Sequence, residues 1–165
     1  MRTVVTASLA VLVLFLGAVG GVLWLDLRAM RDGEAAGVEA MAAARAVAPD
    51  LLSYDHRTIE QDLARAAEHT TGALTRHYRE LSGTLAAKAR AQQTVQTAAV
   101  AAAAVERAEP GRVEVLMFVN TGTVKKITGK AEPQQQVSQN RARFVMIKQG
   151  SRWLVADLST LIGTV

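Results

Sequence analysis

Six polar residues in the middle of the chain are of types that could perform acid–base chemistry. They are Tyr54, Asp55, His56, Asp62, His77 and Tyr78. A carboxylate or an imidazole serves as a general base when burial or a charged neighbour brings its pKa near the working pH. A catalytic site would therefore require that several of these side chains converge in one pocket.

The spacing of these residues argues against such a pocket. Tyr54, Asp55 and His56 are consecutive at a predicted helix boundary, so they cannot all point the same way. His77 and Tyr78 are adjacent on a predicted helix, where neighbouring side chains face about 100° apart. The carboxylate of Asp55 is better explained as a turn or cap group that accepts from nearby backbone N–H groups. We therefore predict no catalytic residues and expect that the protein is not an enzyme.

Metal and cofactor motifs are also missing from the sequence. The chain has no cysteine, which excludes disulfides and thiolate ligands. His56, His69 and His77 follow no spacing typical of metal ligands. No glycine-rich phosphate loop and no nucleophile elbow occurs. The sequence predicts neither a metal site nor a cofactor.

An uncharged N-terminal run from Val4 to Leu25 predicts a transmembrane helix. At about 1.5 Å per residue it is roughly 33 Å long, against a hydrocarbon core of about 30 Å. Trp24 suits the membrane–water boundary. The alternative, a cleaved signal peptide, usually has an apolar region of only about 7–15 residues. The one candidate cleavage site with small residues, Ala18-Val19-Gly20, lies inside the apolar run. We therefore favour a single-pass anchor in contact with the lipid bilayer.

Two glycines inside this run stand four residues apart. Gly17 and Gly21 form a G-x-x-x-G spacing that would let two membrane helices approach closely and form a homo-oligomer. Glycine is also common in membrane helices generally, and we favour this simpler interpretation. The charges flanking the run, Arg2 on one side and Arg28 and Arg31 on the other, do not decide the orientation.

The composition predicts one ordinary domain after the anchor. The chain has 165 residues and a net charge of +4, with an isoelectric point near 9.9. Its basic residues are dispersed, and the one short cluster is Lys125-Lys126 with Lys130 nearby. A nucleic-acid partner would need a denser basic patch, so we predict none.

Three helices are predicted downstream of the anchor. The first continues out of the membrane over 26–48, and Pro49 favours its end there. Residues 50–55 then form a short connection or a helical turn. Thr58 begins the second helix, with Gln61 as its capping-box partner. The third runs to about Arg90 and carries an apolar stripe that includes Tyr78.

Four strands are predicted to follow. The alanine-rich segment 94–107 favours helix by propensity but strand by context, because the Pro110-Gly111 turn links it to an apolar strand over 113–119. We choose strand for 94–107 and expect 113–119 to be central and covered on both faces, with Phe118 buried. The last two strands span 135–148 and 153–158, joined by a hairpin at Gln149-Gly150-Ser151, and Trp153 should join the core.

Helices that precede strands indicate an α+β domain, with helices packed on one face of an antiparallel sheet. The predicted organisation is a transmembrane segment over 1–25, a helical stalk over 26–50 and an α+β domain over 51–165.

Several segments resemble those of the Mce-associated membrane proteins. The stretch from Leu51 to Ala66, LLSYDHRTIEQDLARA, is similar to the segment that follows the anchor in that family. Thr71-Gly72 with Tyr78 resembles its next helix, VLMFVN over 115–120 its central strand, and GSRWLVADL over 150–158 its closing strand. The order of these matches along nearly the whole chain carries the resemblance. It marks Tyr54, Asp55, Thr58, Trp153 and Asp157 as structural motif residues.

Two positions depart from the family pattern. His56 stands where an aromatic residue is usual, and Asn120-Thr121-Gly122 replaces a more usual Asn-Gln-Thr. We carry no functional role over to them.

The resemblance implies a curved, cone-shaped domain of the cystatin or nuclear-transport-factor-2-like kind, outside the cytoplasmic membrane of an actinobacterium. It implies a non-catalytic accessory or stabilising subunit that binds the subunits of an Mce complex, which imports lipids or sterols. Two alternatives stay open: an assembly subunit of a type IV secretion-like envelope machine, which shares the plan of one anchor and a cone domain, or a cone domain that binds a small ligand.

Overall fold

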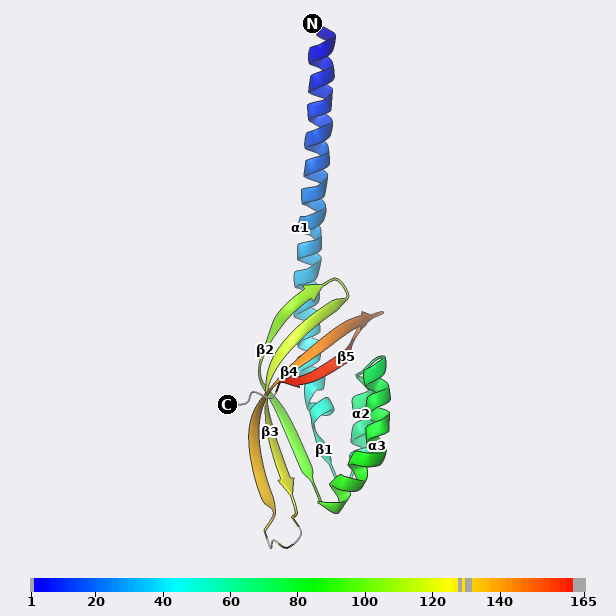
Figure 1. Cartoon of the computed structure of the whole chain (residues 1–165), viewed down its shortest axis with the longest axis vertical. Coiled ribbons are helices and arrows are strands. Elements are labelled where there is room, and N and C mark those ends of the chain that lie inside the picture. The colour runs from blue at the N-terminus through cyan, green and yellow to red at the C-terminus, as the bar shows by residue number, and fades with distance from the viewer. Residues whose placement is uncertain (1, 128, 130–131, 162–165) are drawn as a thin grey trace.

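A computed structural model of the chain describes residues 2–127, 129 and 132–161, with side chains from Gly20 onward except at 22–23, 25–27, 29 and 161. Over these residues it shows helices followed by a five-stranded antiparallel sheet in the order β1-β2-β3-β4-β5 (Figure 1). The elements are α1 (Arg2–Leu52), β1 (Tyr54–Asp55), α2 (Ile59–Glu68), α3 (Ala73–Ala91), β2 (Val95–Glu109), β3 (Arg112–Lys125), β4 (Gln134–Gln149) and β5 (Arg152–Leu161). The predicted α+β class is confirmed.

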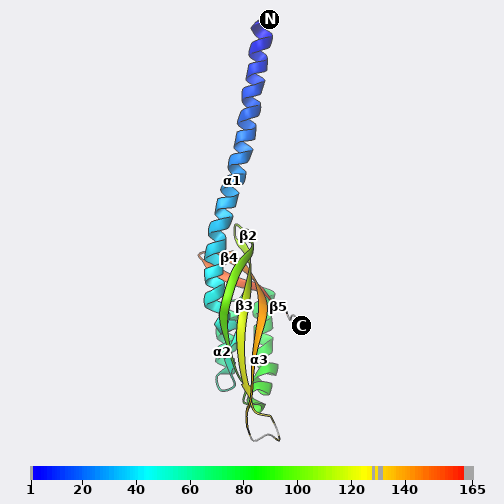
Figure 2. The same ribbon diagram turned by 90° about the vertical axis from the view of Figure 1, so that its left-hand side faces the viewer.

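Helix α1 projects beyond the sheet at its N-terminal end and runs beside β2 at its C-terminal end (Figures 1 and 2). Small side chains permit this close packing. A Cβ added at Gly33 would lie 3.2 Å from the backbone oxygen of Ala108, and Ala40 and Ala44 are fully buried. The predicted boundaries at 25/26 and 50/51 both fall inside α1, because this helix is continuous from Arg2 to Leu52.

The prediction that the helix ends at Pro49 is wrong. Pro49 lies inside α1, which continues to Leu52. Ala48 and Leu51 are buried in the core, and the Pro49 carbonyl accepts a hydrogen bond from the Ser53 N–H at 2.9 Å. Burial and this bond offset the missing proline N–H in the last turn.

Within the described part of the chain, no helix was found that has both the length and the apolar character to cross a membrane. The side chains of residues 4–19 lie outside the description, so the anchor over 4–25 and the contact at Gly17 stay predictions. Apart from its two chain neighbours and the backbone of its own helix, no atom of the described residues comes within 4 Å of a Cβ built on Gly21.

The predicted four-stranded meander is confirmed, including the alanine-rich strand. β2 pairs antiparallel with β3 along its length through the turn at Gly111, whose φ is +83°. Gly150, with φ +61°, turns β4 into β5. The two-residue strand β1 was not predicted; it adds to the edge of β2 through the pairs Tyr54–Gln96 and Asp55–Val95.

The core lies between the inner face of the sheet and the three helices. Its fully buried larger side chains come from α2 and β3 to β5, and they are Ile59, Val113, Val115, Met117, Val119, Phe144, Met146 and Val155. Trp153 is buried, as predicted, with 9% exposed. Phe118 is 40% exposed, so the expectation that β3 is covered on both faces is wrong. Every second residue of β3 points outward, and Phe118 falls in the outward set.

Helices α2 and α3 pack against each other and close the inner face beside α1 (Figure 1). The Tyr78 hydroxyl donates a 2.8 Å hydrogen bond to the Leu51 carbonyl, which joins α3 to the end of α1. Burial raises the pKa of Tyr78 to about 12. Thr70 lies between α2 and α3 and forms an isolated parallel β-bridge with Val155 of β5.

Candidate functional site

The end of α1, strand β1 and the beginnings of α2 and β2 surround a cavity of about 310 Å³. Most of its lining residues carry polar side chains, and three of these are carboxylates. The residues are Pro49, Asp50, Ser53, Tyr54, Asp55, Thr58, Asp62, Arg65, Val95, Gln96 and Thr97. We call this cavity the Asp55 cleft. It contains four residues that the sequence singled out, Tyr54, Asp55, Thr58 and Asp62.

The carboxylate of Asp55 is held by Arg57. It accepts hydrogen bonds from the Arg57 backbone N–H at 2.9 Å, from Nε at 3.1 Å and from Nη2 at 2.7 Å. The bonds from Arg57 lower the pKa of Asp55 to about 2. A carboxylate with this pKa is a weak base at neutral pH, and the predicted role of Asp55 as a turn residue accounts for its contacts.

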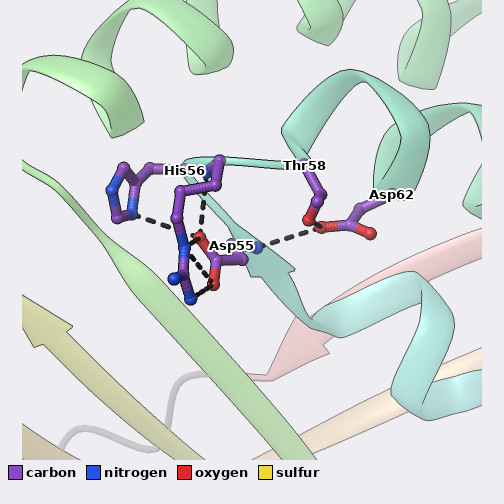
Figure 3. Close-up of polar contacts among 5 residues, drawn as sticks. Asp55, His56, Thr58 and Asp62 are labelled. Atoms are coloured by element: carbon purple, nitrogen blue, oxygen red, sulfur yellow. Dashed lines mark hydrogen bonds and ion pairs between the residues drawn. The ribbon is translucent and has the colours of Figure 1, made fainter.

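A second set of bonds links Asp55 to the first turn of α2 (Figure 3). The Asp55 N–H donates to Asp62 Oδ2 at 3.0 Å, and the Thr58 hydroxyl donates to the same oxygen at 2.9 Å. The predicted capping box between Thr58 and Gln61 does not form, because the Thr58 side chain makes no cap hydrogen bond. Asp62, one residue further along, takes the Thr58 hydroxyl instead.

His56 faces the opposite side of β1 from Thr58 and Asp62 (Figure 3). Its Nδ1 lies 3.2 Å from Asp55 Oδ1 but lacks the geometry of a hydrogen bond. His56 does not line the Asp55 cleft. The structure therefore separates the imidazole from the cavity that holds the neighbouring carboxylate.

Several other polar groups of the cleft also have protein partners. Arg65 lies 3.5 Å from Asp62 and 3.8 Å from Asp50, and His69 Nε2 lies 3.3 Å from Asp50. The Gln96 amide donates to the Leu52 carbonyl at 2.7 Å, and Ser53 Oγ accepts from the Ala98 N–H at 3.0 Å. These bonds fasten the end of α1 to α2 and β2.

The remaining predicted motif residues lie elsewhere. Trp153 donates from Nε1 to Glu39 at 3.2 Å, beneath the Lys148 ammonium group, which is 5.5 Å from the ring centre. Asp157 is exposed on β5, opposite Val145. His77 is exposed while Tyr78 is buried, as predicted. Among the described residues, no group of three potential ligands is placed to hold a metal ion.

Sequence reasoning missed Asp50, Ser53 and Gln96 as parts of the cleft. Gln96 meets Leu52 across 44 residues of chain, and no local pattern marks such a contact. The sequence shows that these three residues have acidic, hydroxyl and amide side chains. It does not show that they converge, because their convergence depends on the pairing of β1 with β2.

A second feature is an apolar strip on the outward face of β2 and β3. Phe118 lies in register with exposed Ala102 on one side and exposed Arg141 on the other. Beside it, half-buried Leu116 lies opposite exposed Ala104. We call Ala102, Ala104, Leu116, Phe118 and Arg141 the outer strip.

Solved structures share the fold of this chain. An IcmL-like type IV secretion system protein from Legionella pneumophila aligns with a TM-score of 0.57 and 10% identity, over 75% of this chain and 91% of that one. CagV, a VirB8 homologue from Helicobacter pylori, aligns at 0.54 and 7% identity over 72% and 96%. A protein described as Ntf2-like and involved in plasmid conjugation aligns at 0.54 and 12% identity over 78% and 50%. The fold is therefore nuclear-transport-factor-2-like.

Sequence comparison gives relatives in Mycobacterium tuberculosis. No family model matches the chain. Rv1362c is 31% identical over 160 residues, which cover 94% of this chain and 70% of the relative. Rv1973, named as an outer membrane protein, is 33% identical over 140 residues, which cover 84% and 83%. With this identity over most of both lengths, the chain belongs to the family of the mycobacterial proteins Rv1362c and Rv1973.

Proposed function

We propose that the protein is a membrane-anchored assembly subunit of an envelope machine, which acts by binding other protein subunits and performs no chemistry. The observation that carries this proposal is the outer strip, because it places a 40% exposed phenylalanine on the surface of a central strand. Interface energy is concentrated in aromatic and arginine side chains, and Phe118 with Arg141 is such a pair. The fold shared with an IcmL-like secretion protein and a VirB8 homologue supports an assembly role.

The chemistry of the Asp55 cleft supports the same proposal. A base must accept a proton near neutral pH, but Arg57 holds the Asp55 carboxylate and lowers its pKa to about 2. Asp62 already accepts two hydrogen bonds from its own chain, and Asp50 is paired with Arg65 and His69. These groups stabilise the junction between α1, α2 and β2.

The finer form of the proposal is that the partners are the subunits of an Mce complex that imports lipids or sterols. The resemblance of several segments to the Mce-associated membrane proteins favours this form. The segment that carries the resemblance, from Leu51 to Ala66, is also the one that forms the Asp55 network. The alternative partners are subunits of a type IV secretion-like machine, which the solved structures favour.

Site-specific photo-crosslinking would test the proposal in intact cells. A photoreactive residue at position 118 should cross-link to envelope subunits, whereas the same residue at exposed position 79 on α3 should not. Mass spectrometry of the products would separate Mce subunits from secretion-type subunits. Equal cross-linking from both positions, or none from position 118, would contradict the proposed surface.

Complementation tests the non-catalytic part of the proposal. Asp55→Asn, His56→Ala and His77→Ala should each restore function to a deletion strain at matched protein levels. Phe118→Glu should fail to do so and should lower the level of the partner subunits, with Arg79→Glu as the matched surface control. Loss of function in a folded Asp55→Asn or histidine variant, with partner subunits still present, would favour a catalytic or ligand-binding pocket.

A further inference from the structure

A second cavity, of about 190 Å³, lies between the C-terminal end of α3, strand β1, the start of β2 and the end of β3. The contacts that form the Asp55 network do not involve its charged residues. The lining consists of Tyr54, Leu85, Lys88, Ala89, Gln92, Thr94, Thr123 and Lys125. We call it the lysine cavity.

Positive charge dominates this lining. Lys88 and Lys125 are its charged members, and neither forms a salt bridge with any residue that the structure describes. No carboxylate lines the cavity. An anion bound in the cavity would be attracted by both of these positive charges.

The backbone carbonyls at the end of α3 do not need these lysines. The Ala89 carbonyl accepts the Thr94 N–H at 2.9 Å, the Gln92 carbonyl accepts the Lys126 N–H at 2.7 Å, and the Lys88 carbonyl accepts the Gln92 N–H at 3.1 Å. Because backbone groups already satisfy the helix terminus, the ammonium groups remain available to a ligand.

Hydroxyl donors line the same cavity. Thr94 is only 5% exposed and is one of the residues that line the cavity. A threonine hydroxyl at the wall of a cavity can donate a hydrogen bond to an anionic oxygen. Tyr54 is half-buried, and burial raises the pKa of its phenol, so it stays protonated and can donate. Leu85 and Ala89 supply an apolar wall.

We propose that the lysine cavity binds the oxyanion group of a small molecule, a carboxylate or a phosphate. Lys88 and Lys125 neutralise its charge, Thr94 donates a hydrogen bond to it, and Leu85 and Ala89 contact any apolar part of the ligand. This site is separate from the outer strip, so its failure would leave the assembly proposal unaffected.

Binding is measured by calorimetry on the full-length protein in nonionic detergent. The probes are sodium phosphate, sodium hexanoate and hexylamine at equal ionic strength. Saturable binding of phosphate or hexanoate, but not of hexylamine, is expected. Tighter binding of hexanoate would show that the apolar wall is used, and tighter binding of phosphate would assign the site to an inorganic or phosphoryl anion. Absence of saturable binding by both anions, or equal binding of hexylamine, would overturn the proposal.

Variants locate the binding site. The affinity for the anion should fall about tenfold in Lys88→Gln and in Lys125→Gln, since each substitution removes one charge-assisted contact. Thr94→Val keeps the side-chain shape and should weaken binding several-fold. Lys126→Gln is the matched control, because this neighbouring lysine does not line the cavity. If Lys126→Gln weakens anion binding as much as Lys88→Gln and Lys125→Gln do, the attraction is non-specific. That result would contradict the proposal. Thermal melts of each unliganded variant confirm that the fold is intact.

Discussion

The carboxylate of Asp55 illustrates how a residue of a catalytic type acquires a structural role. It lies in a cavity of useful size, but its oxygens face the Arg57 guanidinium and its own N–H is bonded to Asp62. These contacts stabilise the charged form and fix the chain where β1 passes into α2. The same contacts make the stability of the protein sensitive to acid.

The substitution Asp55→Asn should change how the stability of the protein depends on pH under acidic conditions. The pKa of Asp55 is about 2 in the folded protein, below its ordinary value of 3.8, so its stabilisation is complete above about pH 4 and is lost as the pH falls toward 2. The variant should melt a few degrees lower at pH 7 and lose less stability between pH 4 and pH 2 than the wild type. Melting curves across pH 2–7 check this. Asp157→Asn is the control, and an Asp55→Asn profile parallel to wild type would contradict the assignment.

Trp153 and Phe118 should differ in their effect on stability. Trp153 is 9% exposed and bonded to Glu39, and Trp153→Ala should cost about 3–5 kcal/mol in the free energy of unfolding. Phe118 is 40% exposed, and Phe118→Ala should cost at most about 2 kcal/mol. Denaturant titration of both variants measures the difference. A near-wild-type Trp153→Ala would show that the ring contributes little to the core.

The packing of α1 on β2 depends on the smallest side chains. Alanines and glycines line one face of the helix, and Gly37 lies within 3.4–3.6 Å of Ala108 and Val105 when given a Cβ. The helix therefore lies close to the strand backbone, where larger side chains have no room. By covering β2, α1 also shields part of an edge strand that would otherwise be open to pairing with other chains.

Two glycine substitutions should act in opposite directions. Gly33→Leu places atoms against the Ala108 carbonyl, which is already 3.2 Å from an added Cβ, and should destabilise the protein by about 1–3 kcal/mol. Gly83 lies inside α3 with no other atom within 4 Å of an added Cβ, so Gly83→Ala should stabilise by about 0.5–1 kcal/mol. Melting temperatures of both variants test this. Equal tolerance at both positions would mean that α1 can move away from β2.

The molecule as a whole couples a long N-terminal helix directly to the domain core. α1 contributes buried alanines to the core and is continuous from Arg2, so no flexible linker separates its N-terminal end from the sheet. If residues 4–25 span the membrane, the domain is held at a fixed distance and orientation above the bilayer. A fixed orientation suits a subunit that must present one face to its partners.

Membrane fractionation tests the anchor. The protein should pellet with membranes and resist extraction by high salt and carbonate, because the run from Val4 to Leu25 is apolar and uncharged. Protease added to intact spheroplasts should then remove residues 26–165. Recovery of a soluble protein that begins after residue 20 would identify a cleaved signal peptide, and complete protection from protease would place the domain in the cytoplasm.

Most of the element order could be predicted from local signals. The turns at Pro110-Gly111 and Gly150 identified hairpins, and these turns also explained why the alanine-rich segment became β2 rather than a helix. The apolar stripe of α3 placed Tyr78 inward and His77 outward, as found. Local signals failed at Pro49 and Thr58, where burial of Leu51 and the carboxylate of Asp62 outweighed the usual end and cap preferences.

The sequence alone determined the order of helices and long strands, the meander and the absence of cysteine chemistry, since these follow from periodicity, turn residues and composition. The tertiary structure decided which face of each strand is covered, and so left Phe118 at the surface. It also decided which polar groups come together: the Gln96 amide bonds to the Leu52 carbonyl, and Lys88 and Lys125 line one cavity. Such meetings depend on strand register and helix placement across long stretches of chain, which no local pattern records.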